Sequence, residues 1–213
     1  MSRERRQSRL VNRETWHLIL RLIGALSKCP TKLKASNIYS FKMGKRMEHT
    51  VVIRNYQNAD REECRALWRE LTEWHREIYQ DPTIGGEHPE LYFDKYLTNI
   101  RPAHVWVATL DSKTVGLIGL IIKEDEAEIE PLIVSKPYRR RGIGKQLIET
   151  AINEARKTGI KFLNIAPVAR NVQTIKYVYN LGFQKLGFVQ LFIDFTNKKW
   201  KPGLKLHGCT FDY

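Results

Sequence analysis

The sequence contains little cysteine and no long uncharged apolar run. Three cysteines occur in 213 residues (Cys29, Cys64 and Cys209), and none belongs to a CxxC pair. Widely spaced cysteines in odd number argue against a disulfide scaffold and against a zinc site, so we expect no metal. No stretch of about eighteen apolar residues is free of charge, so we expect no membrane-spanning helix. We also expect a cytoplasmic location, because no convincing export signal is present.

Acidic residues are scarce in the first 46 positions. This segment contains 12 Lys and Arg but only two acids, Glu4 and Glu14, a net charge of +10. Residues 47–213 contain 24 basic and 21 acidic residues, a net charge of +3. The overall charge of +13 thus comes mainly from one segment, and no recognisable nucleic-acid-binding motif accompanies it. We therefore expect no nucleic-acid partner.

The composition divides the chain into a basic N-terminal extension, 1–46, and one domain, 47–213. Apolar residues within 16–26 recur at helical spacing after five arginines, a pattern also found in signal peptides and in basic helices at membrane surfaces. Arg21 interrupts the apolar run, and a strand pattern begins only after Met47. We interpret the extension as flexible. With 42% hydrophobic residues the chain can form a packed core in the remainder.

Hydrophobic periodicity predicts a series of strands and helices from residue 51 onward. Short polar turns at 111–113 and 124–126 join three strands and indicate an antiparallel meander. Asp60 and Glu63 have the spacing of a capping box at a helix start. The predicted elements are strand 51–56, a helix that includes 66–74, helix 89–97, strands 105–110, 115–122 and 127–134, helix 145–157, strand 162–166, helix 171–180, strand 189–195 and a last short strand with Leu204, Leu206 and Phe211.

The segment 133–145 combines the features of an anion-binding turn. A buried strand runs into three successive arginines, 139–141, and then into a helix opened by Gly142 and Gly144. Unpaired amides at a helix start, together with the helix dipole, attract anions, and glycines let the backbone approach a phosphate. Leu147 stands where a dinucleotide fingerprint needs a third glycine, and no GxxxxGK[ST] occurs. The sequence therefore predicts an anion site that is neither of these loops.

The same segment resembles the pyrophosphate motif [QR]xxGx[GA] of the GCN5-related N-acetyltransferase (GNAT) family, matched here by 139–144. The likeness extends to strand 128–134, helix 145–157, Asn171 and Leu181-Gly182-Phe183. The resemblance implies an α/β acetyltransferase fold with a mixed, mainly antiparallel sheet and helices on both faces. It also implies acetyl-CoA as cosubstrate, and transfer of the acetyl group to an amine by direct attack in a ternary complex.

The resemblance also implies which residues bind the donor. Asn171 matches a family asparagine that lies near the pantetheine arm, and the backbone of Leu132, Ile133 and Val134 would pair with that arm. The pyrophosphate would rest on the turn and the helix start, which comprise Arg139, Arg140, Arg141, Gly142, Ile143, Gly144 and Lys145.

Two carboxylates are candidates for the base that takes the amine proton. Glu128 and Glu130 are two apart on one strand and therefore lie on one face. An amine with a pKa of about 10.4 needs a base or a water chain before it attacks. The alternative is that both side chains face solvent and balance nearby lysines.

A tyrosine is the candidate general acid. The family often has one four residues before the glycine of its Gly-Phe pair, but this chain has Val178 there, flanked by Tyr177 and Tyr179. Since one step along a helix rotates a side chain by about 100°, neither tyrosine inherits the role automatically. We take Tyr177 as the candidate. The alternatives are that both rings pack against the sheet, or that the thiolate leaves without an acid.

The acceptor side remains open at the level of sequence. The acceptor is an amine-bearing small molecule or protein, and the protein is expected to be a monomer or homodimer. A non-catalytic acyl-CoA-binding regulatory module is the alternative function. The first helices and their loop either line an acceptor cleft or form ordinary aromatic core; the residues concerned are Trp68, Trp74, His75, Tyr79, Gly85, Gly86, Glu87 and His88.

Overall fold

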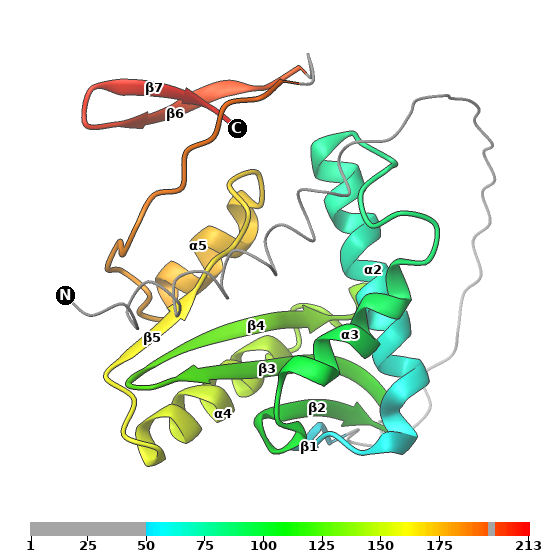
Figure 1. Cartoon of the computed structure of the whole chain (residues 1–213). Helices are drawn as coiled ribbons and strands as arrows, with labels where there is room; N and C mark the ends of the chain where they lie inside the picture. Colours follow the sequence, from blue (N-terminus) through cyan, green and yellow to red (C-terminus); the bar gives the residue numbers. More distant parts are fainter. Residues whose placement is uncertain (1–49, 196–198) are drawn as a thin grey trace, which may run out of the picture.

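The structure is a computed structural model that describes residues 50–195 and 199–213 (Figure 1). The predicted extension, 1–46, lies outside the described residues. Among the residues described, no helix is long and apolar enough to cross a membrane. The same residues contain no group of three or more His, Cys, Asp or Glu side chains placed to hold a metal ion.

Five strands form one sheet in chain order. They are β1 (Val52–Asn55), β2 (Val105–Leu110), β3 (Lys113–Lys123), β4 (Glu126–Val134) and β5 (Phe162–Ile165). Strands β1 to β4 pair antiparallel, and β5 pairs parallel to β4. The predicted meander and the mixed, mainly antiparallel sheet are thus confirmed. A helix must intervene between β4 and β5, because two parallel neighbours cannot be joined by a tight turn.

Helices cover both faces of this sheet (Figure 1). On one face lie α2 (Arg61–Tyr79) and α3 (Tyr92–Asn99), preceded by the short 3-10 helices η1 (Asn58–Asp60) and η2 (Pro89–Leu91). The other face carries α4 (Ile143–Lys157) and the buried Val178 of α5 (Val172–Asn180). Two further 3-10 turns, η3 (Pro102–His104) and η4 (Lys136–Tyr138), precede β2 and α4.

The core consists of two apolar layers separated by the sheet. Leu117 of β3 packs with Phe93 of α3 in one layer, whereas the next residue, Ile118, packs with Leu147 of α4 in the other. All four side chains are fully buried. This alternation follows from the two-residue period of a strand, and it explains why β3 reads as a continuous apolar run.

The C-terminal segment differs from the prediction. No strand is found at 189–195 within the described part of the chain, so that prediction is wrong. The segment instead makes local aromatic contacts: Phe192 lies 5.1 Å from Trp200 between ring centroids, and the Trp200 Nε1 donates to Asp194 (2.7 Å). The apolar side chains of 186–195 are largely exposed, among them Leu186, Phe188, Leu191, Ile193 and Phe195.

The last predicted strand is in fact a hairpin of two strands. Strands β6 (Pro202–Leu206) and β7 (Cys209–Asp212) form a separate antiparallel sheet. His207 and Gly208 join them with φ angles of 50° and 80°. A two-residue turn with both φ angles positive matches the twist of a hairpin, and glycine adopts such a φ without strain. We missed this turn because the pair His-Gly is a weaker signal than Asn-Gly.

Asp60 is the buried charge that joins β1, β3 and the start of α2. The predicted capping box of Asp60 with Glu63 is wrong, because the Asp60 side chain makes no cap to α2. Its oxygens instead accept from the Arg54 guanidinium (2.6 and 2.7 Å), the Gln57 amide (2.8 Å) and the Thr114 hydroxyl (3.1 Å). Burial alone would raise the pKa of Asp60, but these hydrogen bonds lower it below its usual value.

Replacing this carboxylate should destabilise the fold. We expect Asp60→Asn to lower the free energy of unfolding at pH 7 by about 2–4 kcal/mol, because the amide cannot accept both guanidinium bonds. The carboxylate stabilises the fold fully above its unfolded pKa of about 3.9, and this contribution is lost as pH falls through the lower folded pKa. Urea titrations of both proteins at pH 7 and pH 3 measure this difference.

The matched control is Glu77→Gln on the exposed surface of α2, which should change the free energy of unfolding by less than about 0.5 kcal/mol. Equal stability of the Asp60→Asn variant and the wild type at pH 7 would show that the network is not stabilising.

Candidate active site

The candidate site begins where β4 and β5 separate. The two strands pair only from Glu126 to Ile129 of β4. Directly after this stretch β4 has a bulge, because one residue of β3, Gly119, stands opposite both Glu130 and Pro131. A Cβ at Gly119 would overlap the Tyr96 hydroxyl, which donates to the Glu130 carbonyl (2.6 Å). The bulge is thus held by a side chain of α3.

Beyond the bulge, one backbone edge of β4 is open. Leu132, Ile133 and Val134 pair with β3 on one side, whereas no strand of the described residues pairs with them on the other. An open edge presents amides and carbonyls at strand spacing, which an extended, amide-containing ligand can pair with. These are the residues predicted to contact pantetheine, and the open edge is compatible with that prediction.

The turn after β4 presents a row of backbone amides. Arg140 and Gly142 have φ angles of 61° and 79°, and α4 begins at the buried Ile143. Within the described part of the chain, no hydrogen bond is recorded for the amides of 140–145, and the first one of α4 runs from Gln146 to the Gly142 carbonyl (3.1 Å). Free amides at a helix start, with the positive end of the helix dipole, form a site for an anion.

Arg139 anchors this turn to the rest of the protein. Its Nε donates to the Val134 carbonyl (2.7 Å) and its Nη2 to Glu70 of α2 (3.2 Å), while its guanidinium lies 6.0 Å from the ring centroid of Trp74. The same Glu70 oxygen accepts from the amide of Lys136 (2.5 Å). Sequence reasoning assigned Arg139 to the anion and missed Glu70, because no local motif links residues about seventy positions apart.

The remaining cations of the turn are less constrained. Arg140 is exposed, and Arg141 lies 5.5 Å above the ring of Tyr138. Lys145 forms an ion pair with Glu149 one turn further along α4 (3.7 Å). Such solvent-exposed cations are free to turn toward an anion on the amides, which supports their predicted role.

Tyr177 lies beside the same turn. A Cβ at Gly144 would be 3.1 Å from the Tyr177 hydroxyl, so the phenol packs against the first turn of α4. Val178 is buried in the core, and Tyr179 is 55% exposed. The structure thus associates the candidate acid Tyr177 with the anion-binding turn, and no recorded contact joins it to Glu130.

Asn171 is buried at the start of α5. Its Oδ1 accepts from the Thr174 amide (3.2 Å) and caps the helix. This bond leaves the carboxamide NH₂ group as the part of Asn171 available to a ligand. The predicted contact with pantetheine would therefore have to use this group as a donor.

The two candidate bases lie at the bulge. Glu128 is buried, with 9% of its surface exposed, and Glu130 follows two residues later. Burial is the main cause that raises the pKa of Glu130 to about 7; the charge of Glu128 raises it further and Lys123 lowers it. A carboxyl group with a pKa near neutrality is suited to accept a proton at physiological pH.

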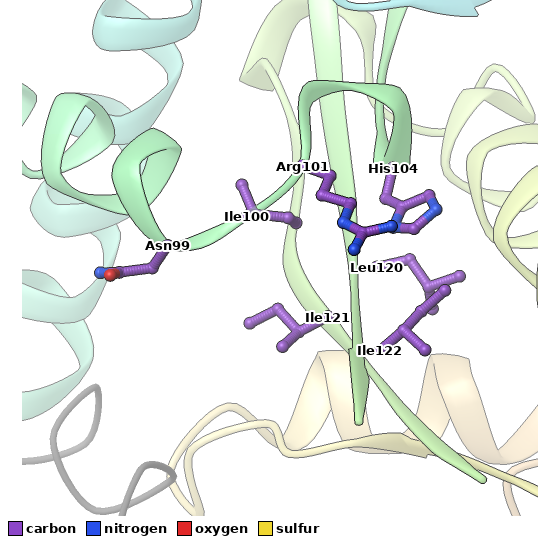
Figure 2. A pocket seen from close by; sticks show the side chains of 7 residues that line it. All are labelled: Asn99, Ile100, Arg101, His104, Leu120, Ile121 and Ile122. Atoms are coloured by element: carbon purple, nitrogen blue, oxygen red, sulfur yellow. The ribbon is translucent and has the colours of Figure 1, made fainter. Parts of the chain in front are cut away.

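A cavity of about 290 Å³ lies on the outer half of β3 (Figure 2). Asn99, Ile100, Arg101 and His104 form one wall of it, and Leu120, Ile121 and Ile122 form the other. Ile121 pairs with Glu128 across the two strands, so both side chains point to the same face of the sheet. This cavity, which the sequence did not indicate, thus includes one residue that stands opposite Glu128 on the neighbouring strand.

The residues predicted to line an acceptor cleft have different roles. Trp68 belongs to the core, with its ring 5.3 Å from Tyr96, and Trp74 covers Arg139. Burial lowers the pKa of His75 to about 4, so it is neutral at pH 7. Tyr79 stacks on Arg170. Only part of the predicted group is thus available to a ligand.

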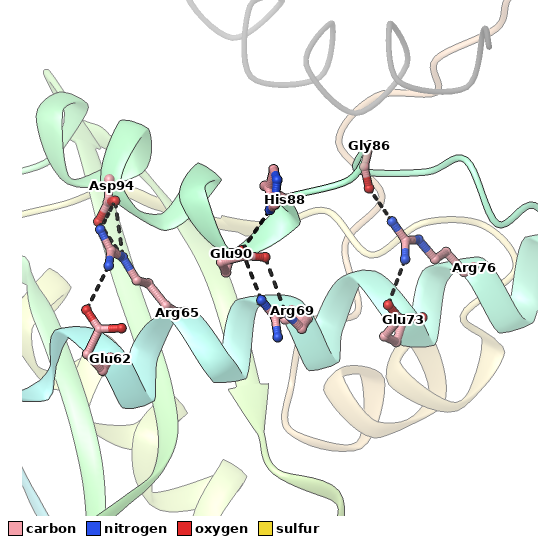
Figure 3. Close-up of polar contacts among 9 residues, drawn as sticks. All are labelled: Glu62, Arg65, Arg69, Glu73, Arg76, Gly86, His88, Glu90 and Asp94. Atoms are coloured by element: carbon pink, nitrogen blue, oxygen red, sulfur yellow. Dashed lines mark hydrogen bonds and ion pairs between the residues drawn. The ribbon is translucent and has the colours of Figure 1, made fainter.

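Polar contacts hold α3, and the loop that follows α2, against α2 (Figure 3). Arg65 pairs with Asp94, and Arg69 pairs with Glu90. Arg76 donates to the carbonyls of Ile84 and Gly86. Gly85 packs so closely on Thr72 that a Cβ there would overlap the threonine methyl group. Glu87 and His88 are exposed on this loop, and His88 approaches Glu90 (3.4 Å).

Comparison with known proteins identifies the family. A family model described as "Acetyltransferase (GNAT) family" matches residues 68–183, which is more than half of the chain. The chain belongs to the GNAT acetyltransferase family. The matched residues of this GNAT domain include the turn 139–145, both carboxylates and Tyr177.

Curated relatives carry N-acetyltransferase names. The chain is 27% identical over 141 residues to human "N-acetyltransferase 8", covering 63% of this chain and 59% of the relative. It is 34% identical over 83 residues to "Probable N-acetyltransferase camello" of Xenopus laevis, covering 38% of each chain. The chain thus spans less than two thirds of the length of these relatives.

Solved structures share the fold. An acetyltransferase of the GNAT family from Staphylococcus aureus superposes with a TM-score of 0.54 at 19% identity, covering 67% of this chain and 94% of that one. The PaiA N-acetyltransferase from Thermoplasma acidophilum, solved in complex with coenzyme A, gives a TM-score of 0.53 at 25% identity and covers 62% and 88% of the two chains. The expected α/β acetyltransferase fold is confirmed.

Removing the Glu70 carboxylate should loosen the anion-binding turn. We expect Glu70→Ala to lower the free energy of unfolding by about 1–2 kcal/mol, because two hydrogen bonds to a partly exposed charge are lost. Exchange of the amide protons of 135–139 should also accelerate. Thermal denaturation and hydrogen exchange measure these two effects.

The control is Glu73→Ala on the same helix, whose carboxylate is 53% exposed and pairs with Arg76. It should cost less than about 0.5 kcal/mol and leave the turn protected. Equal effects of the two variants would contradict an anchoring role of Glu70.

Proposed function

We propose that this chain transfers the acetyl group of acetyl-CoA to an amine by direct attack in a ternary complex. The observation that carries the proposal is the continuous path from the open edge of β4 to the free amides at the start of α4, with Glu130 at its beginning. Family membership and the names of the relatives support the same reaction. A cytoplasmic location and a monomeric or homodimeric state stay predictions from the sequence.

The donor would lie along this path in two parts. The backbone of Leu132–Val134 would pair with the amide-containing pantetheine arm, and Asn171 would donate to it. The pyrophosphate would rest on the amides of 140–145, with Arg140, Arg141 and Lys145 adding positive charge. Arg139 is engaged by Glu70 and Val134, so we assign it to holding the turn in place.

Glu130 would act as the base. Its carboxylate accepts the proton of the acceptor ammonium, and the neutral nitrogen then forms a bond to the thioester carbon. The carbonyl oxygen gains negative charge, which a backbone amide of the open β4 edge can stabilise. When the C–S bond breaks, the electron pair leaves with the thiolate, and the nitrogen, now bonded to the acetyl carbon, loses its second proton to water to give the neutral amide. Glu128 lies two residues away on the same strand, and its carboxylate would help to attract the ammonium of the acceptor.

Tyr177 was the candidate that would protonate the thiolate. Since its hydroxyl packs against Gly144, at the end of the path assigned to the pyrophosphate, we propose that the thiolate leaves without that acid and takes its proton from water. The buried Val178 favours a second candidate function, a non-catalytic acyl-CoA-binding module. Release of free thiol from acetyl-CoA over a panel of amines distinguishes the two functions.

A carboxylate placed in the anion-binding turn should weaken donor binding. We expect Gly144→Asp to lower the affinity for acetyl-CoA at least about tenfold, or about 1.4 kcal/mol, because it puts a negative charge beside the phosphates. Calorimetric titration with acetyl-CoA measures the affinity directly.

Gly187→Asp is the matched control, since a side chain there meets nothing within 4 Å and the site lies outside the turn. It should bind acetyl-CoA like the wild type. If a folded Gly144→Asp protein also does so, the turn is not the phosphate site.

Removing the proposed base should slow the reaction without affecting donor binding. We expect Glu130→Gln to reduce kcat by about 10²–10⁴ at pH 7 while acetyl-CoA affinity stays nearly constant. Because the base must be ionised, the wild-type rate should fall as pH drops through the Glu130 pKa of about 7. The variant should lack this inflection, and its deficit should shrink at high pH as more amine is neutral. Rates measured from pH 6 to 10 show both effects.

Two further variants complete this experiment. Glu128→Gln and the double variant determine which carboxylate takes the proton, and Glu126→Gln, exposed on the same strand, serves as the control. Wild-type rates for both single variants and the double variant at neutral pH would exclude the carboxylates as bases.

A further inference from the structure

Arg170 occupies a position that neither the fold nor the proposed reaction explains. It lies in the loop between β5 and α5, next to Asn171. Since β5 pairs with β4 only as far as Ile129, this loop leaves the sheet at the level where the open edge of β4 begins. Arg170 lies near the end of this loop, five residues after β5.

Two aromatic rings fix the guanidinium of Arg170. Its Cζ lies 4.7 Å from the ring centroid of Tyr79 at the end of α2 and 5.5 Å from that of Trp200 in the C-terminal segment. Three distant parts of the chain thus meet at one cation. Rings beside a guanidinium restrict its rotation and keep water from it, so its hydrogen-bonding edge has a defined direction.

One edge of this guanidinium has no partner among the described residues. Its Nη1 donates to the Tyr79 carbonyl (3.3 Å), but its Nε is buried without a hydrogen bond. No carboxylate of the described residues forms an ion pair with Arg170, and no hydrogen bond is recorded for its Nη2. A buried hydrogen-bond donor without a partner destabilises the folded state by about 1–3 kcal/mol. The unpaired Nε of Arg170 therefore needs an explanation.

The chemistry of the free edge selects its ligand. The Nε and Nη2 donors point in parallel and match the two oxygens of a carboxylate, which they can bind with two charge-assisted hydrogen bonds once the atoms that cover the buried Nε move aside. Glu128 and Glu130 lie at the bulge of β4, where their ionised carboxylates would attract an ammonium group. An acceptor that carries both an ammonium and a carboxylate group would complement the carboxylates of β4 and the guanidinium of Arg170.

We propose that Arg170 binds the carboxylate of the acceptor, so that the preferred substrates are amino acids or other amines that bear a carboxylate. This inference rests on the proposed function and narrows its substrate class. The alternative is that Arg170 only holds the C-terminal segment to α2 through Trp200 and Tyr79.

Matched acceptors distinguish these roles. Each amino acid of a series with increasing distance between amine and carboxylate is compared with its carboxamide, at saturating acetyl-CoA. We expect Arg170→Gln to lower kcat/KM for both acceptors of the best pair to different extents. The factor by which it falls should be at least about ten times larger for the acid than for the amide. For each acceptor, the kcat/KM of the wild type is divided by that of the variant. This ratio cancels the difference in basicity between the amine of the acid and the amine of the amide. The KM for acetyl-CoA should stay within twofold of the wild-type value.

Two variants guard against misfolding and non-specific charge effects. Arg170→Lys keeps the charge but not the paired donors, so it should lose part of the discrimination, and it replaces Arg170→Gln if the latter does not fold. Arg156→Gln, an exposed arginine of α4, should leave the discrimination unchanged. Equal losses for acid and amide in the Arg170 variants would overturn the inference and assign Arg170 to a structural role.

Binding measurements separate this inference from the proposed reaction. The same acids and amides are titrated calorimetrically into the wild-type protein and the Arg170 variant in the presence of CoA. Preferential binding of acids that depends on Arg170, without acetylation of any amine, would support the inference and contradict the proposed reaction. Acetylation without any preference for a carboxylate would support the reaction and overturn the inference.

Discussion

The separation of β4 from β5 is the constraint on which the candidate site depends. The two strands share backbone hydrogen bonds only up to Ile129, and a bulge at Glu130 and Pro131 follows. A bulge increases the local twist of a strand and ends regular pairing. It leaves a backbone edge open in the middle of an otherwise paired sheet, where an edge normally promotes association with another strand. Here the open edge leads directly into the anion-binding turn.

Helix α2 organises the surroundings of this opening. Glu70 holds the turn before α4, and Tyr79 at the end of the same helix contacts Arg170 on the other side. The ion pairs with α3 and the contacts of Arg76 with its loop fix this helix on the sheet. A rigid helix that contacts both sides of a site can keep distances between groups constant, as binding and catalysis require.

The charges around the opening are arranged by sign. Free amides and cations lie at the start of α4, and the buried Glu128 and the half-buried Glu130 lie at the bulge. This arrangement suits a phosphate-bearing donor at one end and a cationic amine at the other. Burial is the main cause that raises the pKa of Glu130 and the charge of Glu128 adds to it, so the packing around β4 also supports the role of the proposed base.

The sequence by itself determined the order of the elements from β1 to α5, the meander and the glycine-containing turn between β4 and α4. These features depend on local properties: the strand period of 115–122, the polar turns, and Gly142 and Gly144 at a helix start. The prediction was wrong for 189–195, because an apolar run shows a preference for a strand but does not specify which backbone it pairs with. Here the segment makes aromatic contacts with Trp200 and does not join a strand.

Only the tertiary structure decided which side chains meet. The pairs Glu70 with Arg139 and Tyr79 with Arg170 are separated by 69 and 91 positions, and no sequence period connects them. The orientation of Tyr177 toward Gly144 depends on how α5 packs on the core through Val178. The bulge likewise depends on Tyr96 reaching the Glu130 carbonyl from another helix. Local patterns specify elements, whereas contacts between distant residues arise only when those elements pack.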